Sequence, residues 1–455
     1  MAPKFGTSGL RGLVTELTAD LVAAHLRAFA ATCPMGTGLW VGRDLRASSP
    51  DLAAAVIAAG RSMGLCVTDC GAVPTPALAL AAMGAGAASV MVTGSHIPAD
   101  RNGLKFYTPT GEITKADEAA ILGALGRPSP NLPSPPVATC PTAGADWVAR
   151  YVTAFGARAL AGLRVGVWAH SAVSRDLLAK ALQDMGAQAV SLGRSETFVP
   201  VDTEAVSPAA RADLAAWAPG LDAIISTDGD GDRPLLADGA GRVIPGDILG
   251  QITAARLGAE TVVTPVSSNT GAEASGRFGR VIRTKIGSPF VIAAMQDAGG
   301  RVVGYEANGG FLLGFEAAGP AGPLPALMTR DSLLPLVTVL QAARQAGGLA
   351  ALMAAEPARF TAADRLEETP PEVTGPLLAA LTADPAPLLS PLSETEAARD
   401  TTDGLRLTLA SGRILHLRPS GNAPEFRIYA EAETAEAAAR LLQQARDRLS
   451  ARIAS

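Results

Sequence analysis

The segment Leu221-Asp-Ala-Ile-Ile-Ser-Thr-Asp228-Gly-Asp230-Gly-Asp232-Arg233 runs from a short apolar stretch into three carboxylates at alternate positions. The apolar stretch predicts a buried strand, so the acids should follow the carboxyl end of that strand. Glycines between the acids free the backbone to bring the three carboxylates to one point. So much negative charge on one loop favours a bound cation over a solvated acidic turn.

The spacing of the acids excludes a calcium loop of the EF-hand type, which needs Gly at its sixth position and Glu at its twelfth. Here those two positions hold Arg233 and Gly239. The loop offers only oxygen donors, with a guanidinium beside them, and this combination suits Mg²⁺ serving a phosphate. We therefore expect a magnesium site at a strand end, where open α/β sheets bind their ligands.

The composition is typical of a globular protein with several well-packed cores. At 455 residues, with 48% hydrophobic and 18% charged residues, the chain is long enough for three or four domains. A net charge of −5 gives no general attraction for nucleic acid or an anionic membrane, so any anion site must be local. The four cysteines lack a metal-type spacing, and no signal-peptide pattern or membrane-spanning apolar run is present. We expect a cytoplasmic protein with reduced thiols.

Apolar strand patterns alternate with helical patterns through the first three quarters of the chain, which predicts parallel sheets flanked by helices. A proline-rich stretch over 127–141 reads as a linker between the first and second rounds of this pattern. The predicted strands are 39–41, 65–68, 89–92, 164–168, 223–226, 261–264, 281–283 and 301–304. The last part differs: a hairpin over 405–417, a strand over 426–430 and an amphipathic helix over 434–452 predict a smaller α+β unit.

A second chemical signal, Thr93-Gly-Ser95-His96-Ile-Pro98, directly follows the predicted strand 89–92. We expect Ser95 to lie exposed on a strand-to-loop turn, with His96 as a neighbouring proton acceptor. Asn102-Gly103 then predicts a turn, and Lys105 supplies a cation. A serine that carries a phosphoryl group needs access, a proton acceptor and cations, so this loop favours phosphoryl transfer over a plain helix-capping loop.

Three further segments could bind a sugar phosphate. Arg418-Pro-Ser420-Gly421-Asn422-Ala-Pro-Glu-Phe-Arg427 sets two arginines around a turn whose N–H groups can form an anion nest, although an exposed hairpin end is the simpler alternative. Gly304-Tyr-Glu306-Ala-Asn308-Gly-Gly offers a carboxylate and an amide to neighbouring hydroxyls. Lys285 adds a cation after the predicted strand 281–283; a surface lysine is an equal alternative.

These loops, in this order, resemble the α-D-phosphohexomutase superfamily over nearly the whole chain, as do the N-terminal segments Phe5–Gly12 and Val41–Arg46. The resemblance implies three tandem α/β domains with mixed, mostly parallel sheets and a C-terminal α+β domain, arranged around a central active-site cleft. The expected domains are 1–140 with the serine loop, 141–243 with the metal loop, 244–356 with the sugar loop and 357–455 with the phosphate loop.

The resemblance also implies a phosphosugar mutase, an isomerase that interconverts hexose 1-phosphate and hexose 6-phosphate through a hexose 1,6-bisphosphate intermediate. Ser95 would carry the phosphoryl group and, with Asp228, Asp230 and Asp232, hold one Mg²⁺ per chain. The remaining expected roles are phosphoryl-oxygen contacts by Arg11, Lys105 and Arg233; general acid or base catalysis by His96 or Lys285; sugar binding by Glu306 and Asn308; and phosphate binding by Arg418, Ser420, Gly421, Asn422 and Arg427.

The chain departs from the family pattern at three of these loops. In the phosphate loop, Asn422-Ala-Pro424 stands where the family often has Thr-Glu-Pro or Thr-Thr-Pro. Ile97 stands where the serine loop usually has Asn, and the sugar loop has Asn308 in place of Ser and lacks the usual histidine. The resemblance is greatest to bacterial phosphomannomutase-type proteins, so we expect mannose phosphate first, then glucose phosphate, then glucosamine phosphate. Two other classes stay open, a metal-dependent serine phosphatase and a non-catalytic sugar-phosphate sensor. We expect no nucleic-acid or membrane partner, and a monomer or homodimer.

Overall fold

In the computed structural model, the described residues are 3–6, 9–128, 132–420 and 425–454. They divide into two units by their contacts. The first unit holds Met1–Val262 and Gly287–Met353, and the second holds Val263–Ile286 and Ala354–Ser455. Among the described residues, no helix is both long and apolar enough to cross a membrane. The four cysteines are free thiols.

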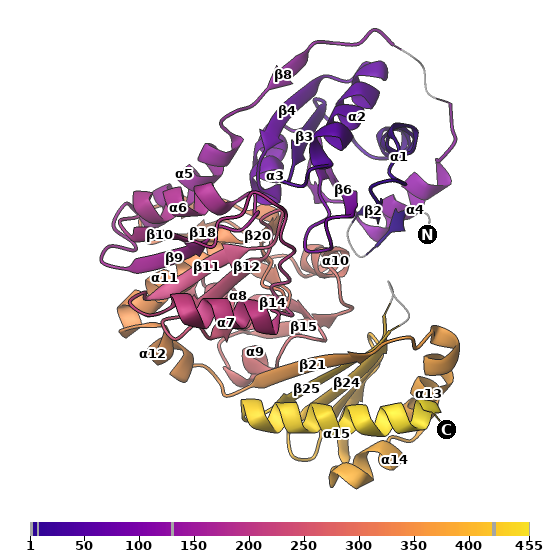
Figure 1. Ribbon diagram of the computed structural model, residues 1–455, viewed down its shortest axis with the longest axis vertical. Coiled ribbons are helices and arrows are strands. Elements are labelled where there is room, and N and C mark those ends of the chain that lie inside the picture. The colour runs from indigo at the N-terminus through magenta and orange to yellow at the C-terminus, as the bar shows by residue number, and fades with distance from the viewer. Residues whose placement is uncertain (1–2, 7–8, 129–131, 421–424, 455) are drawn as a thin grey trace. The chain divides into compact units, whose positions relative to one another are not determined.

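The first sheet of the first unit is mixed, as predicted. Its order is β1-β2-β6-β5-β3-β4-β8, with β7 beside β6; pairing is parallel from β5 to β8 and antiparallel on the other side of β5. The strands are β1 Lys4–Phe5, β2 Leu10–Leu13, β3 Leu39–Arg43, β4 Val67–Ala72, β5 Ala88–Val92, β6 Arg101–Thr108, β7 Gly111–Glu112 and β8 Val137–Thr139. The helices are α1 Ala19–Thr32, α2 Ser49–Ser62, α3 Thr75–Gly84 and α4 Lys115–Gly123, of which α1 and α2 lie side by side (Figure 1).

The second sheet carries the acidic segment. Its order is β10-β9-β11-β12-β13, parallel from β10 to β11 and antiparallel from β11 to β13. Its strands are β9 Arg164–Trp168, β10 Gln188–Leu192, β11 Ala223–Thr227, β12 Pro234–Asp238 and β13 Val243–Ile244, and its helices are α5 Ala143–Phe155, α6 Arg175–Asp184 and α7 Pro208–Trp217. Every residue of β11 is buried, as the apolar run predicted, and the chain turns back antiparallel into β12 directly after the acids.

The last part of the first unit contains an antiparallel set, β16 beside β17 and β17 beside β20. The elements of this stretch are α8 Gly246–Arg256, the start of β14 Thr261–Pro265, whose last three residues belong to the second unit, α10 Ser288–Ala298, β16 Val302–Tyr305, β17 Phe311–Leu313, β18 Ala317–Ala318, β19 Pro323–Leu324, β20 Leu327–Asp331, α11 Leu333–Ala346 and α12 Leu349–Ala354. Helix α11 is buried along most of its length, because apolar residues occupy nearly every position of its first three turns.

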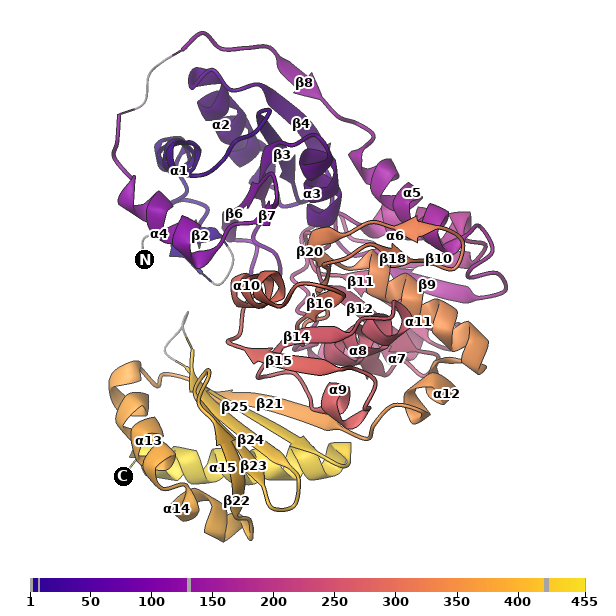
Figure 2. The same cartoon turned by 180° about the vertical axis from the view of Figure 1, so that it is seen from behind.

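The second unit is built on an antiparallel sheet with the order β21-β25-β24-β23-β22, and α15 packs on β21 and β25 (Figure 2). Its elements are α9 Gly271–Ala274, β15 Arg280–Thr284, β21 Phe360–Leu366, α13 Pro371–Ala383, α14 Ala386–Leu389, the 3₁₀ turn Ser390–Leu392, β22 Glu396–Asp400, β23 Leu405–Leu409, β24 Ile414–Pro419, β25 Phe426–Ala432 and α15 Ala435–Ala454. The predicted hairpin over 405–417 and the predicted helix over 434–452 are confirmed.

Two local predictions were wrong. Asn102-Gly103 is not a turn but part of β6, where Gly103 pairs with Arg11 and a Cβ on Gly103 would lie 2.1 Å from the Leu10 carbonyl oxygen. Glycine is needed there for close strand approach, not for a turn. The proline-rich stretch also contains β8, which pairs in parallel with β4.

Candidate active site

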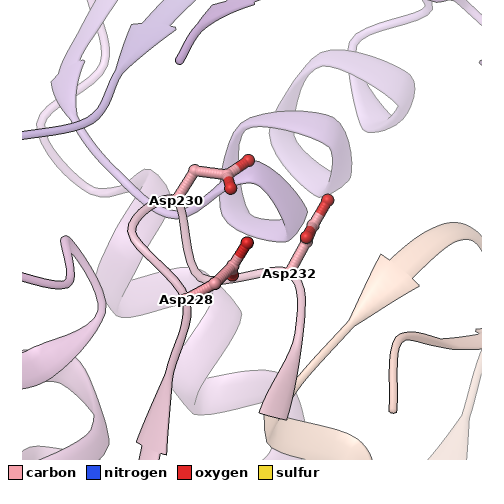
Figure 3. A group of neighbouring side chains, drawn as sticks. All are labelled: Asp228, Asp230 and Asp232. Carbon is pink, nitrogen blue, oxygen red and sulfur yellow. The ribbon is translucent and has the colours of Figure 1, made fainter. Parts of the chain in front are cut away.

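Asp228, Asp230 and Asp232 converge on the loop between β11 and β12. One carboxylate oxygen of each lies within 4.8 Å of those of the other two, and all three side chains are fully buried. Figure 3 shows the three carboxylates around a common space. Like charges at that separation repel by at least about 3 kcal/mol per pair at an effective dielectric constant of about 20. A buried arrangement of this kind requires a nearby positive charge.

Backbone contacts hold this loop in place. Gly231 has a φ of +79°, a left-handed conformation that glycine adopts without strain. A Cβ on Gly229 would lie 2.7 Å from the Ser95 carbonyl oxygen, so only glycine allows this loop to approach the serine loop so closely. The Ser332 hydroxyl donates a hydrogen bond to the Gly231 carbonyl at 2.7 Å, and the Val173 N–H donates to the Gly229 carbonyl.

Lys105 supplies part of the positive charge. Its Nζ lies 2.6 Å from Oδ2 of both Asp230 and Asp232. Burial raises the pKa of Asp230, but Lys105 and the Thr75 hydroxyl outweigh burial and hold that pKa below its usual range. Burial, followed by the charges of Asp230 and Asp232, raises the pKa of Asp228 well above its usual value.

The donor set fits a divalent metal ion. The Oδ1 atoms of Asp230 and Asp232 are buried and have no hydrogen-bond partner among the described residues. Two orphaned carboxylate oxygens and a third carboxylate facing them form the hard, oxygen-only donor set that such ions prefer. The three aspartates predicted from the sequence are therefore brought together at one point.

Ser95 lies directly against this metal loop. Its Oγ donates a hydrogen bond to Asp228 Oδ2 at 2.6 Å, and its φ of 55° is unusual for a residue other than glycine. The expectation that Ser95 is exposed was wrong, because the serine loop packs on Gly229 and the side chain is fully buried. The expected pairing of Ser95 with the acidic loop is present in the geometry.

An arginine that the sequence analysis noted only within an N-terminal segment supports the serine loop. The buried guanidinium of Arg46 donates to the carbonyl oxygens of Ser95, Ile97, Pro98 and Arg101. Asp44 pairs with Arg46 at 3.2 Å and accepts a hydrogen bond from the Thr93 hydroxyl at 2.7 Å. Arg46 thus replaces the regular backbone pairing that this irregular loop lacks.

His96 lies between the serine and an arginine. Its Nδ1 accepts a hydrogen bond from Arg233 at 2.8 Å and lies 3.3 Å from Ser95 Oγ. Burial, followed by the charge of Arg233, lowers the pKa of His96 to about 3. The imidazole is therefore neutral at physiological pH and is a hydrogen-bond acceptor, but a weak base.

Further cations surround the acids in the first unit. Burial and the charges of Arg233 and Arg330 lower the pKa of Arg11 to about 10. Arg330, on β20, was not predicted from the sequence as a site residue. Its Nη2 lies 3.0 Å from Asp232 Oδ2. The only sequence signal for Arg330 is a charged pair, Arg330-Asp331, at the end of a short strand, which is too common to single it out.

The sugar loop is the turn between β16 and β17. Glu306 is buried, and its Oε2 has no hydrogen-bond partner among the described residues. Asn308 uses its side-chain oxygen to accept the Gly310 N–H at 3.0 Å, and its carbonyl accepts the Thr203 hydroxyl at 2.8 Å. In this arrangement Glu306 retains an oxygen for a ligand, while the side-chain oxygen of Asn308 stabilises the turn.

The second unit contains the remaining predicted residues. Arg418 and Arg427 stand directly opposite each other on β24 and β25, and Arg365 on β21 is the next partner of Arg427. Like charges opposite each other destabilise a sheet, and here neighbouring carboxylates such as Asp403 and Glu425 partly offset the arginines. Ser420 follows β24, and Lys285 is exposed after β15. Gly421 and Asn422 lie outside the described residues.

Four family models match successive parts of the chain. They are the phosphoglucomutase/phosphomannomutase alpha/beta/alpha domains I, II and III, over residues 2–129, 147–241 and 245–360, and the C-terminal domain of the same family, over residues 377–448. These matches agree with a fold of three α/β parts followed by a smaller C-terminal part.

Two similar relatives cover almost the whole chain. A phosphomannomutase of Sinorhizobium fredii is 46% identical over 98% of both chains. A phosphomannomutase of Salmonella muenchen is 41% identical over 96% of this chain and 94% of its own. A crystal structure of a phosphoglucomutase/phosphomannomutase family protein from Burkholderia thailandensis superimposes with a TM-score of 0.78 at 22% identity, covering 98% of this chain and 97% of its own, which shows a shared fold.

Proposed function

Because the chain belongs to the phosphoglucomutase/phosphomannomutase family, we propose that it interconverts mannose 1-phosphate and mannose 6-phosphate. The enzyme is an intramolecular phosphotransferase, an isomerase. The observation that carries the proposal is the hydrogen bond, at 2.6 Å, from Ser95 Oγ to a carboxylate of the buried aspartate triad. A nucleophilic oxygen and a metal-type donor set meet there, which is what phosphoryl transfer through a phosphoserine requires.

In the proposed mechanism, phosphorylated Ser95 donates its phosphoryl group to the free hydroxyl of a hexose 1- or 6-phosphate. The hydroxyl loses its proton as the new P–O bond forms and the bond to Ser95 Oγ breaks. The resulting hexose 1,6-bisphosphate reorients, and its other phosphate returns to Ser95. Glu306 accepts hydrogen bonds from sugar hydroxyls in both orientations.

Asp228, Asp230, Asp232 and the phosphoserine would hold one Mg²⁺, which would neutralise charge on the phosphoryl oxygens. Lys105, Arg11 and Arg233 contribute fixed positive charge around the same point, so positioning and electrostatics provide most of the rate acceleration. The low pKa of His96 favours Lys285 as the group that exchanges a proton with the sugar hydroxyl. Free cysteines are consistent with a cytoplasmic location.

A side-by-side assay tests the substrate. We expect kcat/KM to be greatest for mannose 1-phosphate, lower for glucose 1-phosphate and lowest for glucosamine 1-phosphate. A greater value for glucosamine 1-phosphate would overturn the choice of sugar and leave the mutase chemistry intact. Release of inorganic phosphate at a rate rivalling isomerisation would instead indicate a phosphatase. Failure to detect a phosphate on Ser95 by intact mass, with no turnover, would favour a sensor.

We propose that Arg427 and Arg418 bind the phosphate that is not being transferred. Arg427→Met should raise KM for hexose 1-phosphate about tenfold or more and change kcat much less, because such a contact is made equally in the ground and transition states. Steady-state kinetics measure both constants. Arg440→Met, which removes an exposed arginine from α15, is the matched control and should leave both unchanged. A fall in kcat with unchanged KM would assign Arg427 to the chemical step instead.

A further inference from the structure

One buried guanidinium faces three carboxylates from three parts of the first unit. Arg330 is 1% exposed. Its Nη2 lies 3.0 Å from Asp232 of the metal loop, and its Nε lies 3.3 Å from Glu112 on β7. Its Nη1 lies 3.7 Å from Oε2 of Glu306 in the sugar loop. Arg330 therefore lies between the phosphoryl-transfer centre and the group that meets the sugar.

Glu306 alone would present an uncompensated buried carboxylate, which would attract a cationic ligand strongly. With Arg330 beside it, the positive charge of the guanidinium, which Asp232 and Glu112 share, offsets part of the negative charge of Glu306. The 3.7 Å separation is too long for a hydrogen bond, and Glu306 Oε2 has no hydrogen-bond partner among the described residues. A neutral hydroxyl can donate to that oxygen, whereas an ammonium group near it would face the guanidinium at close range.

We propose that Arg330 is a specificity-determining residue that disfavours amino-hexose phosphates relative to neutral hexose phosphates. This inference rests on the proposed function and concerns the sugar that the same site accepts. The proposal is supported by the position of Arg330 beside Asp232 and Glu306.

Glucose 1-phosphate and glucosamine 1-phosphate form the matched probe, because they differ only in the hydroxyl or the ammonium at C2. The readout is the ratio of kcat/KM for glucosamine 1-phosphate to that for glucose 1-phosphate at neutral pH. In Arg330→Gln we expect this ratio to rise about tenfold, since a positive charge near the sugar is removed. In Arg330→Lys the positive charge remains, so the ratio should stay near that of the wild type. The kcat/KM for each of the two substrates should fall, because lysine cannot bridge two carboxylates in the same planar geometry.

Glu112→Gln provides a test of opposite sign. It removes a negative charge from the far side of the guanidinium, so the ratio should fall about threefold. This variant keeps Arg330 and so remains informative if Arg330→Gln does not fold. Arg344→Gln, which removes an exposed arginine from α11, is the control and should leave the ratio unchanged.

The outcomes separate the two proposals. An unchanged ratio in Arg330→Gln would overturn the specificity role, even if activity falls equally on both substrates. If Arg330→Gln does not fold, an unchanged or increased ratio in Glu112→Gln would overturn the specificity role of Arg330. A wild-type protein that turns over no hexose phosphate would instead overturn the proposed function.

Discussion

Ser95→Ala should lose mutase turnover by at least about four orders of magnitude, the scale expected when a covalent nucleophile is removed. Without Oγ, no atom of the enzyme can accept the phosphoryl group between the two half-reactions. The fold should persist, because the change removes one hydroxyl whose principal contacts are Asp228 and His96. A coupled assay of hexose 6-phosphate formation measures turnover, and thermal unfolding checks the fold.

The same variant has a second readout that does not depend on turnover. After incubation with hexose 1,6-bisphosphate, the intact mass of the wild type should increase by one phosphoryl group, and that of Ser95→Ala should not. Ser89→Ala is the matched control, because Ser89 lies on β5 immediately before the serine loop, is buried, and its hydroxyl has no hydrogen-bond partner among the described residues. Full activity in Ser95→Ala would refute the phosphoserine mechanism.

Asp230→Asn should lower kcat by at least about a thousandfold and remove the dependence of stability on magnesium. The substitution replaces a charged donor by a neutral one and leaves Lys105 with one carboxylate partner instead of two. In the wild type, millimolar Mg²⁺ should raise the unfolding temperature by mass action, because the folded state binds the ion and the unfolded chain does not. In the variant that increase should disappear.

Thermal unfolding with Mg²⁺ and with a chelator measures this difference. Asp213→Asn, on the exposed face of α7, carries the same chemical change away from the site and should behave like the wild type. An equal increase in unfolding temperature for wild type and Asp230→Asn would place the ion elsewhere in the protein.

The two loops that carry the proposed chemistry could be predicted from the sequence, because the side chains that form each of them are close together in the chain. Asp228, Asp230 and Asp232 occupy one tight turn after an apolar strand, and Ser95 follows another such strand. Alternation of apolar strands and helical segments also predicts the α/β class. These patterns involve only neighbouring residues, so they can be recognised without the three-dimensional structure.

The remainder of the site depends on contacts between distant segments. Arg330 and Glu112 lie on short strands far apart in the chain, and only the fold brings Arg330 beside both Glu112 and Asp232. The burial of Ser95 likewise follows from the metal loop packing on the serine loop, more than a hundred residues later in the chain. Gly103 looked like a turn residue, whereas its role is to let β2 and β6 approach.

The composition of the second unit has a consequence for synthesis on the ribosome. Val263–Ile286 belongs to that unit, and Thr270 is hydrogen-bonded to Glu431 on β25. This partner of the segment is therefore among the last residues to be translated. At about 5–20 residues per second, β15 and α9 emerge several seconds or more before β25 exists. During that interval Thr270, the N-cap residue of α9, lacks its contact with β25, so we expect a chaperone to bind the nascent chain there.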